Sequence, residues 1–268
     1  MKKLVVLLSM LSLSAQAFTF TPKKNMGKPT TEIELDSGNV ISVRGEVDDA
    51  MASKFIKDVE TVKGDDVYVY ISSPGGSVLS GMKMVSYARA TPKKIICVVD
   101  IAISMAFVFL QACDERLSTE NSIGMQHVTS YSIKPQQAPN AVSFQKFLER
   151  MAEQMDQTQA KRVGLSYSEF KAKTRSDWWT FGEDVAEQGV TDRTVKVTCA
   201  KRLINETTDE TVRTQFGPAS VTWSACPLIT EPLKVNLSSF MGNSIEAVKF
   251  INSLNVRQTV LEKLEGGK

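Results

Sequence analysis

This sequence contains few histidines and cysteines, and its net charge is small. Its 268 residues include one histidine and four cysteines, and 32 basic residues nearly balance 30 acidic ones, so that the net charge is only +2. One imidazole and scattered cysteines cannot build the usual zinc site, and no phosphate loop of the nucleotide-binding kind is present. The balanced charge provides no basic field for nucleic acid. We therefore expect no metal, no other cofactor and no nucleic-acid partner.

Apolar runs long enough to cross a membrane are also missing. The longest early run, Leu4–Leu13, is too short for a permanent span. It follows the basic start Met1–Lys3 and precedes the small-x-small sequence Ala15–Ala17, which together form the pattern of a secretory signal peptide. We expect residues 1–17 to be removed, with cleavage near Ala17-Phe18, and the mature protein to be periplasmic or secreted.

An oxidising compartment would make the four cysteines candidates for disulfide bonds. A bridge between Cys199 and Cys226 would contribute about 3–4 kcal/mol in the chain-entropy model. Cys97 lies in a strand-like pattern and Cys113 ends an apolar helix-like pattern, where cysteine often serves as a small buried residue. We favour the first bridge over a Cys97–Cys113 bridge, and the connectivity stays open because spacing does not determine it.

Strand-like and helix-like patterns alternate between residues 39 and 197, which predicts an α/β domain. Residues 18–38 are polar and predict a loose lead-in segment. The expected strands cover 40–44, 67–72 and 95–99, with short strands near 116–117 and 123–125. One expected helix follows the turn at 73–77 and ends near residue 89. The other expected helices cover 48–62, 103–112, 140–162, 166–173 and 183–188.

A C-terminal extension, residues 198–268, follows this domain and has a different texture. Val212–Phe216 and Val221–Trp223 flank Gly217-Pro218 and predict a β-hairpin. Residues 244–264 predict a final helix. The sequence leaves open whether the extension packs on the α/β domain or serves a partner.

Three side chains of different chemistry stand out in the α/β domain. Ser104 lies at the mouth of an apolar run, the lone His127 follows 23 residues later, and Asp177 precedes two tryptophans. A hydroxyl, an imidazole and a carboxylate are the parts of an acyl-transfer site. Each alone also has an ordinary structural explanation, since serine and aspartate often cap helices or turns. Their meaning depends on whether the fold brings them together.

A tight turn, Ser73-Pro74-Gly75-Gly76, separates a predicted strand from a predicted helix. Exposed backbone N–H groups in such a turn can stabilise a developing negative charge. The same four residues could equally form a plain β-turn.

Taken together and in this order, these motifs resemble the Clp protease proteolytic subunit family. The resemblance covers roughly residues 39 to 196 and implies a crotonase-like α/β superhelix of repeated ββα units. It also implies a homo-oligomeric ring, assembled through the long helix predicted at 140–162. The matching segments are Val40–Val47, Tyr68–Gly76, Ser104-Met105, Asn121-Ser122 with His127, Asp177–Trp179 and Glu187–Val190.

The resemblance assigns a role to each residue of the candidate site. Ser104 would be the nucleophile, His127 its general base and Asp177 the carboxylate that orients the imidazole. The backbone N–H groups of Gly76 and Met105 would form the oxyanion hole. The chain is then expected to be a serine endopeptidase that cleaves short peptides or unfolded proteins. Because the expected signal peptide places it where ATP is absent, we expect no ATPase partner.

Asp100 to Ile103 depart from the family pattern, which has glycine and small residues before the serine. This departure keeps open a second hypothesis, a catalytically silent binding or assembly protein with the same fold. A third hypothesis is a signal-peptide-peptidase-like enzyme with a Ser–Lys dyad. A crotonase acting on coenzyme A thioesters is the least favoured, because that cofactor belongs to the cytoplasm.

Overall fold

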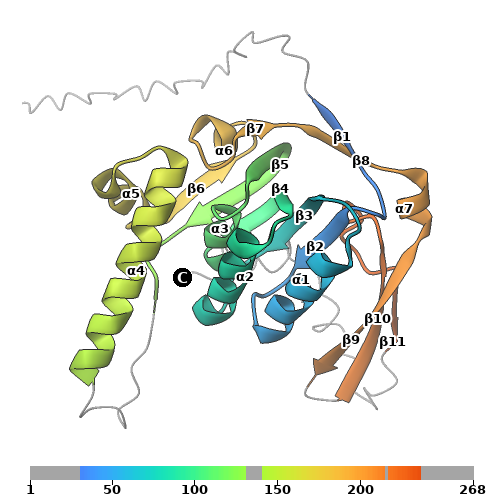
Figure 1. Cartoon of the computed structure of the whole chain (residues 1–268), viewed down its shortest axis with the longest axis horizontal. Coiled ribbons are helices and arrows are strands. Elements are labelled where there is room, and N and C mark those ends of the chain that lie inside the picture. The colour runs from blue at the N-terminus through green and yellow to red at the C-terminus, as the bar shows by residue number, and fades with distance from the viewer. Residues whose placement is uncertain (1–30, 131–140, 215–216, 237–268) are drawn as a thin grey trace, which may run out of the picture.

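The computed structural model describes residues 31–130, 141–214 and 217–236 (Figure 1). The predicted signal peptide, most of the lead-in segment and the predicted helix at 244–264 lie outside these residues. No helix within the described ranges is both long and apolar enough to span a membrane.

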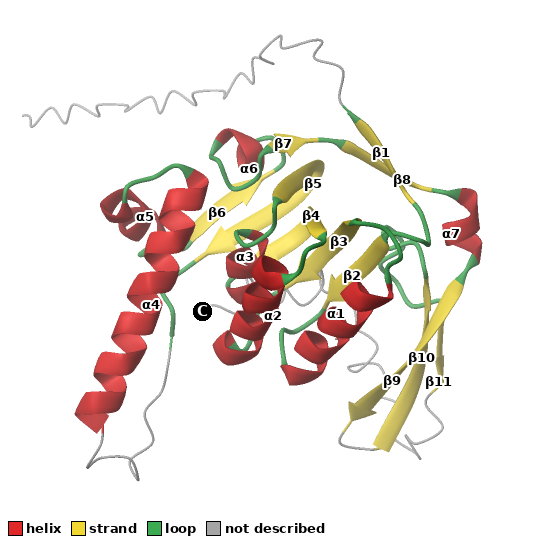
Figure 2. Cartoon of the chain, in the orientation of Figure 1, coloured by secondary structure: helices red, strands yellow, loops and turns green. Residues whose placement is uncertain are grey.

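A six-stranded sheet forms the centre of the molecule (Figure 2). Its strand order is β2-β3-β4-β5-β6, and the short β7 pairs with β5. Strands β2 to β5 are parallel, β7 is parallel to β5, and β6 is antiparallel to β5. The strands are β2 Val40–Arg44, β3 Asp66–Ser73, β4 Lys94–Ile103, β5 Glu115–Gln126, β6 Trp178–Phe181 and β7 Arg193–Thr194.

Three helices cover one face of this sheet and lie side by side in Figure 1. They are α1 Asp49–Thr61, α2 Val78–Ala90 and α3 Met105–Leu110. Their buried side chains pack with Val69 and Ile71 of β3 in the main core. At the β6 end of the sheet lie α4 Ala141–Val163, α5 Tyr167–Thr174 and α6 Asp184–Glu187. The predicted α/β class is confirmed.

The C-terminal extension covers the opposite face of the sheet. Successive side chains of a strand point to opposite faces, so Tyr70 and Val98 lie on the face away from the three helices. They pack with Leu203 and Cys226 of the extension in a second apolar cluster. The extension comprises α7 Lys201–Asn205 and an antiparallel sheet of β9 Thr207–Thr214, β10 Gly217–Ser224 and β11 Lys234–Asn236. It therefore packs on the α/β domain, which the sequence had left open.

Arg44 of β2 joins the sheet to this extension. Its Nη2 atom donates to the carbonyl oxygens of Pro227 at 3.2 Å and Ile229 at 3.3 Å. Its guanidinium carbon lies 4.6 Å from the centre of the Trp223 ring. A Cys199–Cys226 disulfide closes the extension on itself, and a second disulfide joins Cys97 to Cys113.

Several boundaries differ from those predicted. Glu32–Leu35 is not loose but forms strand β1, which pairs in parallel with β8, Lys196–Cys199. Ile103 ends strand β4 instead of opening a helix, because a fully apolar run fits a buried strand as well as a buried helix. The two short strands predicted at 116–117 and 123–125 are one strand, β5. Gly217 and Pro218 lie in β10 and not in the turn of the hairpin.

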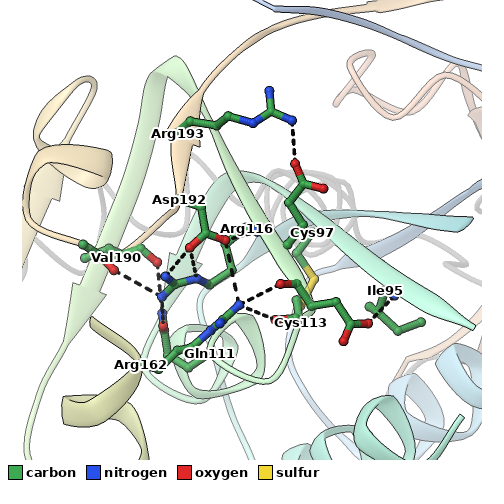
Figure 3. A network of polar contacts seen from close by, with 12 residues as sticks. Ile95, Cys97, Gln111, Cys113, Arg116, Arg162, Val190, Asp192 and Arg193 are labelled. Carbon is green, nitrogen blue, oxygen red and sulfur yellow. Dashed lines mark hydrogen bonds and ion pairs between the residues drawn. A yellow bond between two sulfur atoms is a disulfide. The ribbon is translucent and has the colours of Figure 1, made fainter. Parts of the chain in front are cut away.

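A polar network joins α4 to the sheet (Figure 3). The Arg116 side chain donates to Asp192 and to the Gly189 carbonyl, and it is 4% exposed. Arg162 of α4 donates to the carbonyl oxygens of Cys113 and Asp114 at 2.8 and 2.9 Å. Burial alone would raise the pKa of Asp192, but hydrogen bonds from Arg116 and the charge of its guanidinium hold that pKa below its ordinary value.

We expect Arg44→Ala to loosen the extension, because Arg44 holds two of its carbonyl groups and stacks on Trp223. The free energy of unfolding should fall by about 2–3 kcal/mol, and limited proteolysis should cut the extension faster. Arg202→Ala removes an arginine of the same extension whose side chain is 61% exposed, and serves as the matched control. Equal proteolysis rates in the two variants would contradict the role of Arg44.

The Arg116–Asp192 pair predicts a specific dependence of stability on pH. Because the folded-state pKa of Asp192 is lowered, its contribution is complete above the ordinary pKa of aspartate, about 3.9, and is lost as the pH falls through the folded-state value. The stability difference between the wild type and Asp192→Asn should be constant from pH 7 to about 5 and shrink below about 4. Thermal unfolding measures it, with the exposed Asp65→Asn as a control for net charge. A difference that grows in acid would refute this assignment.

Candidate active site

Ser104 is a single residue between strand β4 and helix α3, and its backbone is strained. Its φ is +55° and its ψ is −117°, a backbone conformation that residues other than glycine rarely adopt. Its N–H donates to the Met125 carbonyl at 2.9 Å, and its carbonyl accepts from the Val108 N–H at 3.1 Å. Its side chain does not cap the helix. The backbone therefore directs this hydroxyl away from the ordinary role of a serine at a helix start.

His127 faces that hydroxyl. It directly follows β5, and its Nε2 atom lies 2.8 Å from Ser104 Oγ, within hydrogen-bond distance. Strands β4 and β5 are parallel neighbours, with Ile103 opposite Met125. The residues that follow the two strands must therefore meet at the same edge of the sheet, where α/β proteins commonly bind their ligands.

The turn after β3 lies at the same edge. A side-chain carbon added to Gly75 would lie 2.6 Å from the Ile103 carbonyl oxygen and 2.8 Å from Ser104 Cβ. The φ of Gly75 is +87°. Glycine is therefore required here both by the close approach and by the backbone conformation.

Two backbone N–H groups near Ser104 are available to a ligand. Within the described part of the chain, neither the Gly76 N–H nor the Met105 N–H donates to a protein acceptor. Met105 is the first residue of α3, where helix N–H groups have no partner inside the helix. Gly76, Ser104, Met105 and His127 all line one small cavity of about 60 Å³.

A larger cavity of about 400 Å³ adjoins the small one, because Val108 and Met155 line both. It lies between α2, α3 and α4, with methionine and valine side chains beside glutamine amides. The larger cavity therefore lies beside the small one that Ser104 lines.

Asp177 is not in contact with this pair. It precedes β6, is exposed, and has a φ of +53°. Among the residues that the structure describes, no hydrogen bond joins its carboxylate to His127. Two of the three predicted side chains are thus brought together, and the third is not.

The residues that depart from the family pattern do not block the site. Asp100 is 3% exposed and accepts a hydrogen bond from Ser72 Oγ at 2.8 Å. Ile103 packs with Ile101, Ile123 and Met125 in a small cluster of its own. Neither Asp100 nor Ile103 lines the cavity at Ser104.

The prediction from sequence missed two glutamines beside His127. Gln126 is 4% exposed and Gln159 is 1% exposed, and the two amides are hydrogen-bonded to each other. A signal was present, because Gln159 follows Met155 by one turn on the apolar stripe of α4, where an apolar residue is expected. In the described ranges, no group of histidine, cysteine and acidic side chains is suited to hold a metal ion.

The chain matches the sequence model of the Clp protease family over residues 26–198. It is 25% identical over 161 residues to an ATP-dependent Clp protease proteolytic subunit 2 of Pseudomonas aeruginosa, covering 58% of this chain and 80% of that protein. It is 29% identical over 162 residues to an ATP-dependent Clp protease proteolytic subunit 3 of Rhodococcus jostii, with the same coverage. The family match spans more than half of the sequence and includes Ser104, His127 and Asp177. The chain therefore belongs to the Clp protease family.

Proposed function

We propose that this protein is a serine endopeptidase that cleaves short or unfolded peptides, with Ser104 as nucleophile and His127 as general base. The observation that carries the proposal is the 2.8 Å separation between His127 Nε2 and Ser104 Oγ at a strained backbone position. Nucleophile and base within hydrogen-bond reach are the signature of an activated serine. Membership of the Clp protease family supports the same reaction class.

The reaction would proceed in two steps. His127 Nε2 takes the proton of Ser104 Oγ as the oxygen attacks the peptide carbonyl carbon, and the Gly76 and Met105 N–H groups bind the resulting oxyanion. The C–N bond then breaks, His127 returns the proton to the leaving amine, and an acyl-serine ester remains. Water, deprotonated by His127, hydrolyses this ester and restores the serine.

We assign the orienting carboxylate to Asp177 because of its place in the ordered set of motifs. Asp177 directly precedes β6, and its side chain is exposed. Catalytic hydrogen bonds are often longer in unliganded enzymes and tighten when substrate binds. The role of Asp177 is therefore tested separately from those of Ser104 and His127.

We place this activity outside the cytoplasm and without an ATPase partner. The N-terminal pattern of a basic start, an apolar run and a small-x-small site supports export. The Cys97–Cys113 and Cys199–Cys226 disulfides support an oxidising compartment. The curated relatives are named as ATP-dependent subunits. ATP is absent outside the cytoplasm, so this chain would act without such a partner.

We also propose a homo-oligomer formed through α4. Phe144 and Phe147 lie on this helix with their rings stacked, and they are 36% and 55% exposed. Exposed aromatic side chains on one helix favour contact with another protein surface. A second copy of the chain fits the ring-forming habit of the family.

A fluorophosphonate probe tests the nucleophile directly. We expect the probe to label the wild type and not Ser104→Ala, and we expect His127→Ala to label far more slowly because the base is lost. Asp177→Asn should lower kcat/KM on a fluorogenic peptide by about 10⁴-fold. Absence of labelling would favour the silent scaffold, whereas labelling that persists in Ser104→Ala would show that another serine is the nucleophile. An unchanged rate in Asp177→Asn would reduce the site to a Ser–His dyad.

Gly75→Ala tests the oxyanion turn. The added carbon would meet the Ile103 carbonyl and Ser104 Cβ, so the turn and the Gly76 N–H must move away from Ser104. We expect kcat to fall by about 10²–10³-fold, the cost of losing one oxyanion donor. Gly64→Ala is the matched control, since nothing lies within 4 Å of a carbon added there. Full activity of folded Gly75→Ala would remove this turn from the mechanism.

A further inference from the structure

We propose that Gln126 and Gln159 are positioning residues, and that their buried amide chain lets helix α4 fix the backbone of His127. The inference rests on the proposed function, because it concerns the placement of the proposed general base. Neither glutamine belongs to the set Ser104, His127 and Asp177.

The chain of hydrogen bonds runs from His127 into α4 without a break. The His127 N–H donates to Gln126 Oε1 at 3.0 Å. Gln126 Nε2 donates to Gln159 Oε1, and Gln159 Nε2 donates to the Met155 carbonyl at 3.2 Å. Each oxygen in this chain accepts a hydrogen bond from the preceding N–H group.

The position of His127 explains why a side chain must hold its backbone. Gln126 is the last residue of β5, and the pairing of β5 with β6 ends there, with Gln126 opposite Trp178. His127 therefore lies beyond the ladder of the sheet. The amide of Gln126 takes over the hydrogen bond that a neighbouring strand would otherwise supply.

Burying two amides is costly unless every polar atom has a partner. Gln159 is 1% exposed on a helix face where Met155, one turn earlier, is 6% exposed. An apolar pair would fill this space without that requirement. A polar pair in which each amide nitrogen and oxygen has a partner instead fixes one arrangement of the two elements, which suits a site that needs an accurate geometry.

Helix α4 is itself held firmly. Arg162 donates to the carbonyl oxygens of Cys113 and Asp114, as Figure 3 shows. Asp156 of α4 forms an ion pair with Lys171 of α5 at 3.1 Å. The position of α4 is thus fixed at its carboxyl end, and Gln159 lies between these two anchors.

The amide chain also lies between the two cavities. Gln126 lines the small cavity at Ser104, Gln159 lines the larger one, and Met155 lines both. Any change in the position of α4 would shift Gln159 and then Gln126. Because a misplacement of about 1 Å can cost about 100-fold in rate, this shift would change the His127–Ser104 contact.

The test compares Gln126→Met, Gln159→Met and the double variant. Each single change leaves a buried amide without a partner and should lower Tm by about 3–6 °C. The double variant removes both amides together, so only the half-buried His127 N–H is left without its acceptor, and part of that Tm should be recovered. Its kcat on a fluorogenic peptide should nevertheless stay about 10- to 100-fold below that of the wild type, with KM changed less than about twofold.

The matched control is the double variant Ser118→Ala/Thr191→Val, which removes another buried polar pair, 2.9 Å apart. It should lower Tm and leave kcat unchanged. Wild-type kcat in the double methionine variant would mean that the glutamines serve stability alone, and the proposal would fail.

A second readout does not depend on activity. The chain has one histidine, so a sample with ¹⁵N-labelled histidine gives a single pair of imidazole signals. We expect the Nε2 signal of the double methionine variant to shift towards that of Ser104→Ala, because the contact with Ser104 is weakened. An unchanged signal overturns the positioning role, whereas a wild type that the fluorophosphonate does not label overturns only the proposed function.

Discussion

Parallel pairing of β3, β4 and β5 fixes the relative positions of the groups proposed to act on substrate. The strands run in one direction, so the turn at Gly75, the hydroxyl of Ser104 and the imidazole of His127 all follow carboxyl ends at one edge of the sheet. Segments that are far apart in the sequence become neighbours without any special loop. The short helix α3 then begins directly after Ser104, the proposed nucleophile, and within the described residues the Met105 N–H has no protein acceptor.

The register of β4 on β5 contains an irregularity that this geometry requires. Val99 lies opposite Ser118, but Ile101 lies opposite Ile123, so β5 carries extra residues between the two pairings. Ser122 Oγ donates to the Val99 carbonyl at 2.6 Å and satisfies the interrupted ladder. A shift of one residue in a strand reverses the faces of its side chains. The irregularity therefore decides that Met125 meets the Ser104 N–H and that His127 faces the hydroxyl.

Much of the fold could be predicted from local patterns, but the candidate site could not. The apolar strands β3 and β4 and the helix α4 were readable because their burial is nearly continuous or helical in period. Ser104 and His127 could be paired only through the family resemblance, since neither has a distinctive local sequence.

The remaining features depend on contacts that local sequence does not encode. Glu32–Leu35 alternates like a strand, but its partner β8 begins at Lys196. The boundary at Ile103 depends on a left-handed backbone at Ser104, which a uniformly apolar run conceals. Asp177 was assigned by its order in the chain, and order fixes neither distance nor exposure. Gln159 contradicts the apolar stripe of its helix, and only the buried amide of Gln126 explains it.

The Cys97–Cys113 disulfide brackets Ser104, the proposed nucleophile, within the chain. Cys97 lies on β4, Cys113 follows α3, and the bond spans a separation of 16 residues with Ser104 between them. The disulfide links the end of α3 back to β4. Movements of α3 away from its neighbours are therefore limited by this covalent link. The strained backbone of Ser104 thus lies inside a covalently closed ring, which limits how far the chain on either side of it can move.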